Sequence, residues 1–220
     1  MPDLDIETTE RLLRRASADL VARFSGVFGA ETIDRYVHES YQALHHTSAI
    51  TQFLPVLAAR FAEERLVALA QATGAMAKPV PEVVFVCTQN AGRSQMAAAL
   101  LGQLGGGRLH VRSAGSQPGE RVEPLVIEVM SEVGIDLSEA FPKPLTDDVV
   151  QAADVVVTMG CGDACPIYPD KQYLDWKVAD PRGQGLDEVR AIREEISAHV
   201  AQLLTQLPGA DRRTPEEPHR

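Results

Sequence analysis

The hydrophobic pattern of the chain changes in character at Ala75–Pro81. From about residue 8 to residue 74, apolar residues recur at helical spacing in three stretches, and no pattern in that part predicts a strand. After Pro81, short runs rich in valine alternate with helical stretches. The prolines at the change disfavour helix, so we place a domain boundary there. We expect a three-helix domain over 1–75, a linker over 76–81, an α/β domain over 82–209 and a loose tail over 210–220.

Alternation of strands and helices in the second part predicts a parallel sheet flanked by helices. Four β-branched runs give four strands, and the first of them, Glu82–Val86, is apolar enough to be buried on both faces. We therefore expect an α/β fold with a four-stranded parallel sheet, preceded by a small helical bundle. The further strands are expected at 108–113, 154–159 and 173–178, and the helices at 94–104, 123–133 and 186–207.

Charge and cysteine content narrow the classes of function. The formal net charge of −10 argues against nucleic acid or an anionic membrane as a partner, because both are bound through clustered Lys and Arg. The first residues contain no apolar run, so we expect a cytoplasmic protein without a membrane segment. Three cysteines are an odd number, which favours reactive thiols over a framework of structural disulfides.

The segment Cys87–Ser94 joins a buried strand to a helix and carries the strongest functional signal. A short turn there would direct successive backbone N–H groups into one concavity at the positive end of the helix, which suits an anion. Arg93 would add a bidentate fork, and the same positive field favours the thiolate form of Cys87. Cys87 could instead be a small apolar residue that ends a strand. The oxyanion-binding residues are expected to be Thr88, Gln89, Asn90, Ala91, Gly92, Arg93 and Ser94.

Two more cysteines follow the third predicted strand. The carboxyl ends of parallel strands share one edge of a sheet, so Cys161 is expected to face Cys87. Cys165 lies four residues further on, and the two thiols could form a disulfide once their Cα atoms come within ~7 Å. A zinc site would require four ligands and no histidine lies nearby, so we assign no metal. Two inert structural cysteines are the remaining alternative.

The residues from Glu82 to about Leu207 resemble the low-molecular-weight protein tyrosine phosphatases and, among them, the arsenate reductases. The resemblance rests on the Cys-x5-Arg-Ser loop, on Ser113-Ala114-Gly115, on the strand 154–159 that leads to Cys161, and on Asp180-Pro181. The helices before it resemble an N-terminal extension of some actinobacterial-type members. The chain departs from thioredoxin-linked relatives in the closer spacing of Cys161 and Cys165. Ala98 stands where those relatives often have a Glu that helps to bind potassium, while Asn90, Ser113 and Asp136 match the other positions.

The resemblance implies an arsenate reductase that uses Cys87, Cys161 and Cys165 in sequence, with thioredoxin as the final reductant and no cofactor. It also implies that Asp180 acts as a general acid, although Asp-Pro is a common opening of an exposed turn. Weak phosphatase activity would then accompany the main reaction. Two alternatives stay open: transfer of arsenate to mycothiol or glutathione, and a non-catalytic oxyanion or redox sensor. The N-terminal helices could dock a redox partner, dimerise or stabilise the chain.

Overall fold

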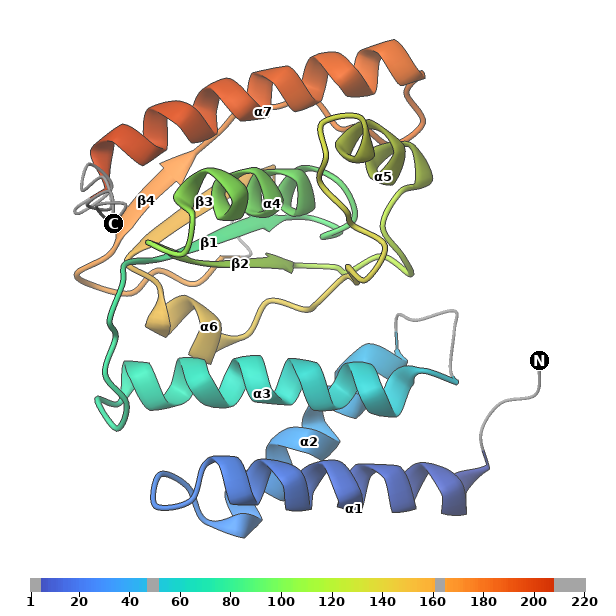
Figure 1. Cartoon of the computed structure of the whole chain (residues 1–220), viewed down its shortest axis with the longest axis vertical. Helices are drawn as coiled ribbons and strands as arrows, with labels where there is room; N and C mark the ends of the chain where they lie inside the picture. Colours follow the sequence, from blue (N-terminus) through green and yellow to red (C-terminus); the bar gives the residue numbers. More distant parts are fainter. Residues whose placement is uncertain (1–4, 47–51, 161–164, 208–220) are drawn as a thin grey trace, which may run out of the picture.

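The computed structural model describes residues 5–46, 52–160 and 165–207. The N-terminal part folds as three helices, α1 (Ile6–Arg23), α2 (Ala30–His45) and α3 (Leu54–Ala72) (Figure 1). The carboxylate of Asp5 caps α1 by accepting from the Thr8 amide at 2.8 Å, and a proline occupies the first turn of α3. The faces that periodicity assigned to the interior form the core of this bundle. Its largest fully buried members are Leu13, Ile33, Leu54, Phe61 and Leu66.

The second part of the chain forms a four-stranded parallel sheet in the order β2-β1-β3-β4. Every residue of β1 is buried, as expected for a strand covered on both faces. In the register of the sheet, Cys87 at the end of β1 lies opposite Gly115 of β2 and Met159 of β3. The strands are β1 (Glu82–Cys87), β2 (His110–Gly115), β3 (Val155–Met159) and β4 (Gln172–Asp175).

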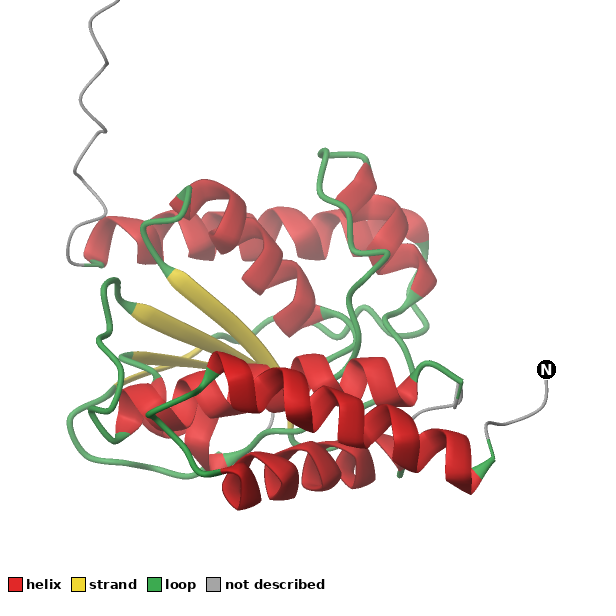
Figure 2. Ribbon diagram, turned by 60° about the horizontal axis from the view of Figure 1, so that its bottom comes forward, coloured by secondary structure: helices red, strands yellow, loops and turns green. Residues whose placement is uncertain are grey.

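Helices cover both faces of this sheet (Figures 1 and 2). On one face lie α4 (Arg93–Gly105), α5 (Pro124–Ser131) and α7 (Leu186–Gln206), which enclose an apolar cluster that includes Cys87. On the other face lies the short helix α6 (Asp147–Ala152), and beneath it α3 of the N-terminal bundle. The first face is covered by helices of the α/β part itself, whereas the second face is covered by α6 together with α3 of the N-terminal bundle.

The contact between α3 and the sheet is both apolar and ionic. Ala68 of α3 is fully buried in a cluster with Val84 and Val86 of β1. Arg65, which is 9% exposed, donates at 3.2 Å to Asp148 of α6 and also reaches Ser40 of α2. The N-terminal helices therefore pack directly on the α/β part. The domain limits set from the sequence remain a prediction.

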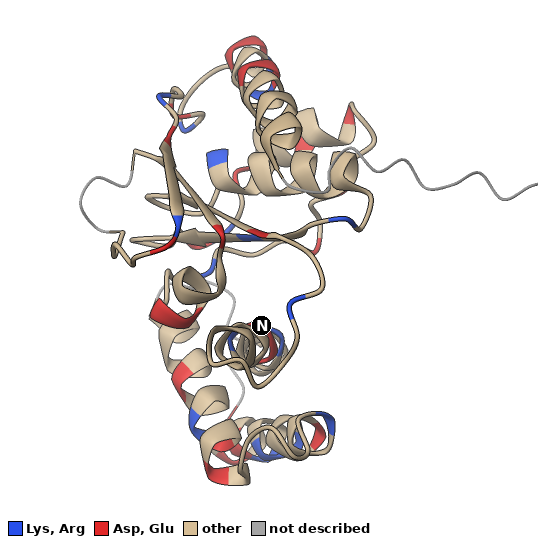
Figure 3. Ribbon diagram, turned by 90° about the vertical axis from the view of Figure 1, so that its left-hand side faces the viewer, with Lys and Arg blue, Asp and Glu red and all other residues tan. Residues whose placement is uncertain are grey.

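The predicted fold class is confirmed, with differences at single elements. The sequence pattern missed α6 because six residues are too few to show a helical period. The fourth strand ends at Asp175 instead of Val178, although Trp176 and Val178 stay buried in the core. Acidic and basic residues are mixed along the N-terminal helices (Figure 3). None of the described helices is both long and apolar enough to cross a bilayer.

Candidate active site

The loop between β1 and α4 surrounds the sulfur of Cys87. This thiol is free and only 2% exposed. Its Sγ accepts a hydrogen bond from the backbone N–H of Asn90 at 3.2 Å and lies 3.0 Å from the hydroxyl oxygen of Ser94. The Ser94 hydroxyl in turn accepts from the side-chain amide of Asn90 at 2.8 Å. The donors around the sulfur therefore suit a thiolate, which accepts hydrogen bonds and makes none.

Asn90 fixes the shape of this loop. Its φ of 49° lies in the left-handed region, which asparagine tolerates better than most residues. The side chain is fully buried, and its oxygen accepts from the Gln95 side chain at 3.1 Å and from the Lys143 amide at 2.8 Å. Gln95 also donates to the Asn90 carbonyl at 3.0 Å. The unusual backbone of Asn90 is thus held by two residues that come later in the chain, one on α4 and one beyond α5.

The carbonyl groups of the loop face away from the sulfur. Backbone N–H groups of the segment after β2 donate to them at 2.8–3.2 Å. Within the described residues, the amides of Gln89, Ala91 and Gly92 donate to no protein acceptor, and they lie at the positive end of α4. Unused donors of this kind form a site for an anion. The carbonyl–amide pairs are Cys87 with Ser116, Thr88 with Gln117, Gln89 with Gly119, and Ala91 with Glu123.

Arg93, at the start of α4, turns inward and is 9% exposed. One terminal nitrogen donates to Asp180 at 2.6 Å, and the other donates to the carbonyl of Val178 at 3.3 Å. Gly160 packs against the guanidinium, since a β-carbon at this position would lie 3.0 Å from Nη1, and its φ of 74° also favours glycine. The cation is therefore held in the site by segments that follow β3 and β4.

Asp180 is the most accessible member of the group, with half of its side chain exposed. Besides Arg93, it accepts from the amide of Arg182 at 3.0 Å. The next residue, Pro181, packs against the loop so closely that a β-carbon on Gly92 would lie 2.6 Å from its Cγ. Asp180 therefore sits at the rim of the site, where a carboxyl group can reach both a bound anion and solvent.

The cysteines after β3 differ in what the structure describes. Cys161 lies outside the described residues, which end at Gly160 on this side; the Gly160 carbonyl accepts from the Thr88 hydroxyl at 2.8 Å. Cys165 is half-buried and packs against the apolar cluster shared by α3, α6 and the sheet. Cys87 belongs to the cluster on the opposite face. The two described cysteines therefore belong to apolar clusters on opposite faces of the sheet.

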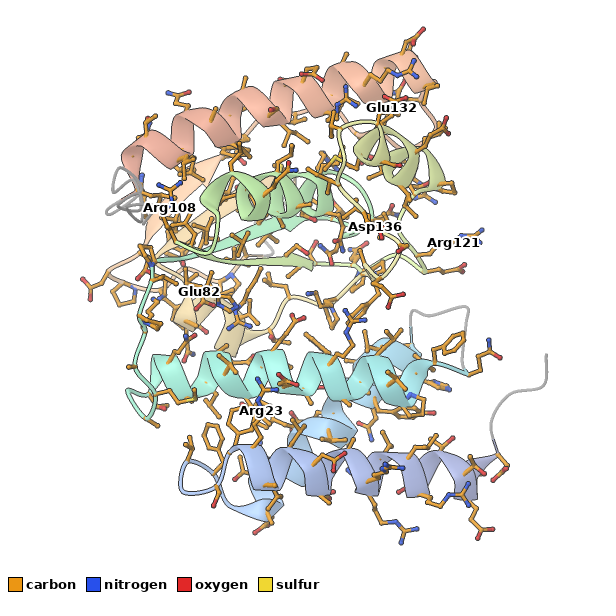
Figure 4. The ribbon with its side chains drawn as sticks, in the orientation of Figure 1. Arg23, Glu82, Arg108, Arg121, Glu132 and Asp136 are labelled. Atoms are coloured by element: carbon orange, nitrogen blue, oxygen red, sulfur yellow. The ribbon has the colours of Figure 1, made fainter. Side chains whose placement is uncertain are left out.

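Two of the residues matched to a potassium site, Asp136 and Asn90, have other partners. The carboxylate of Asp136 accepts from the amide and hydroxyl of Ser138 at 2.8 and 3.0 Å, and these hydrogen bonds lower the pKa of Asp136 (Figure 4). The oxygen of Asn90 is engaged by Gln95 and Lys143, as described above. Over the described part of the chain, no three His, Cys, Asp or Glu side chains are grouped as metal ligands would be.

The structure brings together most of the residues that the sequence singled out. Hydrogen bonds join Cys87, Asn90 and Ser94, and Arg93, which precedes Ser94 on α4, pairs with Asp180. Sequence reasoning missed Gln95 and Lys143, which hold Asn90. Gln95 follows Ser94 directly in the sequence, and its buried position on the first turn of α4 could have been inferred. Nothing in the local pattern of Lys143 indicates its contact with a residue 53 positions earlier.

Comparisons with known proteins agree with this geometry. The pattern of the family described as "Low molecular weight phosphotyrosine protein phosphatase" matches residues 82–213. The pattern described as "Protein-tyrosine-phosphatase-like, N-terminal domain" matches residues 13–70. A glutaredoxin arsenate reductase of Synechocystis is 36% identical over 129 residues, which cover 57% of this chain and 98% of that protein. Arsenate reductase 1 of Staphylococcus epidermidis is 37% identical over 122 residues, which cover 54% and 91%.

Two solved structures extend the comparison. A thioredoxin-dependent arsenate reductase of Corynebacterium glutamicum superposes with a TM-score of 0.82 at 50% identity, over 89% of this chain and 96% of that one. An arsenate reductase in the phosphate binding state superposes with a TM-score of 0.53 at 35% identity, over 58% of this chain and 99% of that one. The first similarity includes the N-terminal helices, whereas the second is confined to a share of the chain about the size of the α/β part.

Proposed function

The chain belongs to the low molecular weight phosphotyrosine protein phosphatase family, and on that premise we propose that it reduces arsenate to arsenite. The observation that carries the proposal is a buried Cys87 sulfur beneath loop amides that donate to no acceptor in the described protein. A phosphatase needs only this loop and an acid. The further cysteines that follow β3 supply the two electrons that reduction of arsenate requires.

The first step is attack of the Cys87 thiolate on arsenic. A sulfur–arsenic bond forms and an arsenic oxygen leaves as water after protonation, so arsenic remains pentavalent. Free loop amides and Arg93 stabilise the oxyanion while this happens. We assign to Asp180, whose half-exposed carboxylate pairs with Arg93, the protonation of the leaving oxygen, the role that the corresponding carboxyl would play toward an alkoxide in a phosphatase.

The next two steps are attacks of a thiolate on sulfur, of which only the second is a thiol–disulfide exchange. Cys161 attacks the sulfur of Cys87, the electron pair of the sulfur–arsenic bond passes to arsenic, and arsenite leaves with arsenic now trivalent. Cys165 then attacks Cys161, which releases the Cys87 thiolate and leaves a disulfide between Cys161 and Cys165. The packing of Cys165 on the far face of the sheet supports this order, because Cys161 would have to carry the disulfide between them.

We assign reduction of the final disulfide to thioredoxin. The support is the thioredoxin-dependent arsenate reductase of Corynebacterium glutamicum, which is similar over nearly its whole length. The proposed location is the cytoplasm, where thiols are kept reduced. In a system that uses mycothiol or glutathione, the thiol would attack arsenic and take arsenate, still pentavalent, from Cys87, which leaves as a thiolate, and Cys165 would be expendable.

The test is a coupled assay of arsenate-dependent NADPH consumption with thioredoxin and thioredoxin reductase. Wild-type protein should turn over many times, and Cys87→Ser should release no arsenite. Cys165→Ser should release one equivalent of arsenite and then stop, because its disulfide cannot move to an accessible pair. Sustained turnover of Cys165→Ser with thioredoxin would refute the relay, and sustained turnover only with mycothiol or glutathione would favour that alternative. Absence of any arsenate-dependent NADPH consumption by the wild type would favour a sensor.

A further inference from the structure

The residues 139–145, here called the connecting segment, lie between α3 and the oxyanion loop. They run from the turn after α5 to the start of α6 and form a parallel β-bridge beside the end of β2, where Pro144 pairs with Gly115. The amide of Gly115 donates to the carbonyl of Lys143 at 2.8 Å, and the amide of Leu145 donates to the carbonyl of Gly115 at 2.8 Å. The connecting segment is therefore fixed to the end of β2, where Gly115 lies opposite Cys87 of β1.

Two residues of the connecting segment contact both the N-terminal bundle and the loop. The ring of Phe141 packs against the apolar core of the bundle, while its carbonyl accepts from the Gln95 side chain at 3.1 Å. The amine of Lys143 donates to both carboxylate oxygens of Glu64 on α3, at 2.8 and 3.1 Å, while its backbone amide donates to Asn90. Side chains face the bundle and backbone groups face the loop.

The ion pair between Lys143 and Glu64 can couple the position of α3 to that of the oxyanion loop. Its side chain is 14% exposed, so water screens this ion pair less than one at the open surface. Glu64 is itself held, because its backbone carbonyl accepts from Arg112 at 2.7 Å. On the other side, Asn90 donates to Ser94, whose hydroxyl lies 3.0 Å from the Cys87 sulfur. Bonded contacts thus run without a gap from α3 to the nucleophile.

We propose that Glu64 and Lys143 are positioning residues, through which the N-terminal bundle sets the conformation of Asn90 and hence oxyanion affinity. The inference depends on the proposed function only for the presence of an oxyanion site. Asn90 holds a left-handed backbone that its own preference does not secure, so the hydrogen bond from the Lys143 amide helps to select it. Loss of the ion pair lets the connecting segment shift and leaves the loop amides less well aimed.

The experiment measures the dissociation constant of inorganic phosphate, a tetrahedral oxyanion, by calorimetry and by protection of Cys87 from alkylation in a Cys161→Ser/Cys165→Ser background. Glu64→Gln and Lys143→Met should each weaken phosphate binding by about fivefold, the lower end of coupling between distinct sites. Lys143→Arg, which keeps the charge, should recover most of the affinity. The double variant Glu64→Gln/Lys143→Met should be no weaker than Lys143→Met alone, because both changes remove one interaction.

The chain offers a matched control in Glu63. It precedes Glu64 on α3, its side chain is also 34% exposed, and it pairs at 2.5 Å with the exposed side chain of Arg23 on α1. Glu63→Gln should cost similar thermal stability without changing phosphate affinity. Equal affinity in Glu64→Gln and wild type would overturn the proposal, and so would equal losses in Glu63→Gln and Glu64→Gln. Wild-type protein that binds phosphate but reduces no arsenate would refute the proposed function. The phosphate affinities of Glu63→Gln and Glu64→Gln would still test the positioning role of Glu64.

Discussion

Removal of Arg65 should reveal how strongly the N-terminal helices stabilise the whole chain. Its guanidinium donates at 3.2 Å to Asp148, to Ser40 and to Glu39, and lies 4.4 Å from the centre of the Tyr36 ring. Asp148 is 6% exposed, so Arg65→Met leaves a buried carboxylate without its cation. Methionine retains the length of the apolar stem, which limits the loss to polar interactions.

The magnitude follows from the burial of the partners. Removal of one member of a buried ion pair costs roughly 3–5 kcal/mol, whereas the half-exposed contact with Glu39 adds at most about 1 kcal/mol. We expect Arg65→Met to lower the free energy of unfolding by about 3–6 kcal/mol. For a chain of this size, that corresponds to a fall in melting temperature of about 6–24 °C.

The measurement is urea unfolding of wild type, Arg65→Met, Asp148→Asn and the double variant, followed by tryptophan fluorescence and far-ultraviolet circular dichroism. Both probes should report one transition at the same midpoint, because the bundle and the sheet share a core. The double variant should be more stable than the sum of the two single losses predicts. Two separate transitions, or a loss below about 0.5 kcal/mol in Arg65→Met, would refute the reasoning.

Three further predictions concern the site and the start of β1. Burial alone would raise the pKa of Glu82, but the adjacent His110 ring and the hydrogen bond and charge of Arg112 outweigh it and hold the pKa below its ordinary value. The ionised Glu82 carboxylate should therefore stabilise the fold fully above the ordinary carboxyl pKa, and this stabilisation should disappear as the pH falls through the lower pKa of the folded state. In denaturant titrations, the stability difference between wild type and Glu82→Gln should shrink between about pH 5 and pH 3. Asp180→Asn should lower hydrolysis of an aryl phosphate by about 10²–10⁴-fold without weakening phosphate binding, since it removes a proton donor and a competitor for Arg93; an equal fall in both quantities would contradict this. Gly92→Ala should cost about 1–3 kcal/mol of stability and weaken phosphate binding, because its β-carbon meets Pro181; a variant that unfolds and binds like wild type would show that this contact yields easily.

The fold was more predictable than the details of the site. Strand β1 and helix α4 could be placed because β-branched residues and helical periodicity are local signals. The same holds for Cys87, Arg93 and Ser94, whose spacing after a strand favours an anion-binding loop. The partners of Asn90 could not be predicted in full. Lys143 donates to Asn90 through its backbone amide, and almost any residue type could make the same hydrogen bond, so the sequence does not reveal it.

The place of the N-terminal helices was also beyond local patterns. Their apolar faces indicate a bundle, but nothing in the helical pattern predicts that Ala68 packs against the sheet or that Arg65 pairs with Asp148. A basic residue on a helix usually lies in solvent, and only the tertiary fold shows Arg65 buried against Asp148. The relation of Cys161 to Cys87 stays a prediction, since Cys161 lies outside the described residues.

The outward direction of the loop carbonyls has a consequence for how sequences of this kind can vary. In the proposed site, the anion would be recognised at positions 89, 91 and 92 by backbone N–H groups, which every amino acid except proline has. Substitutions at Gln89 or Ala91 can therefore drift while the receptor for the anion persists, provided that the new side chain fits beside Gly119. Identity is constrained at Cys87, Asn90, Arg93 and Ser94, where the function depends on atoms that lie beyond the backbone.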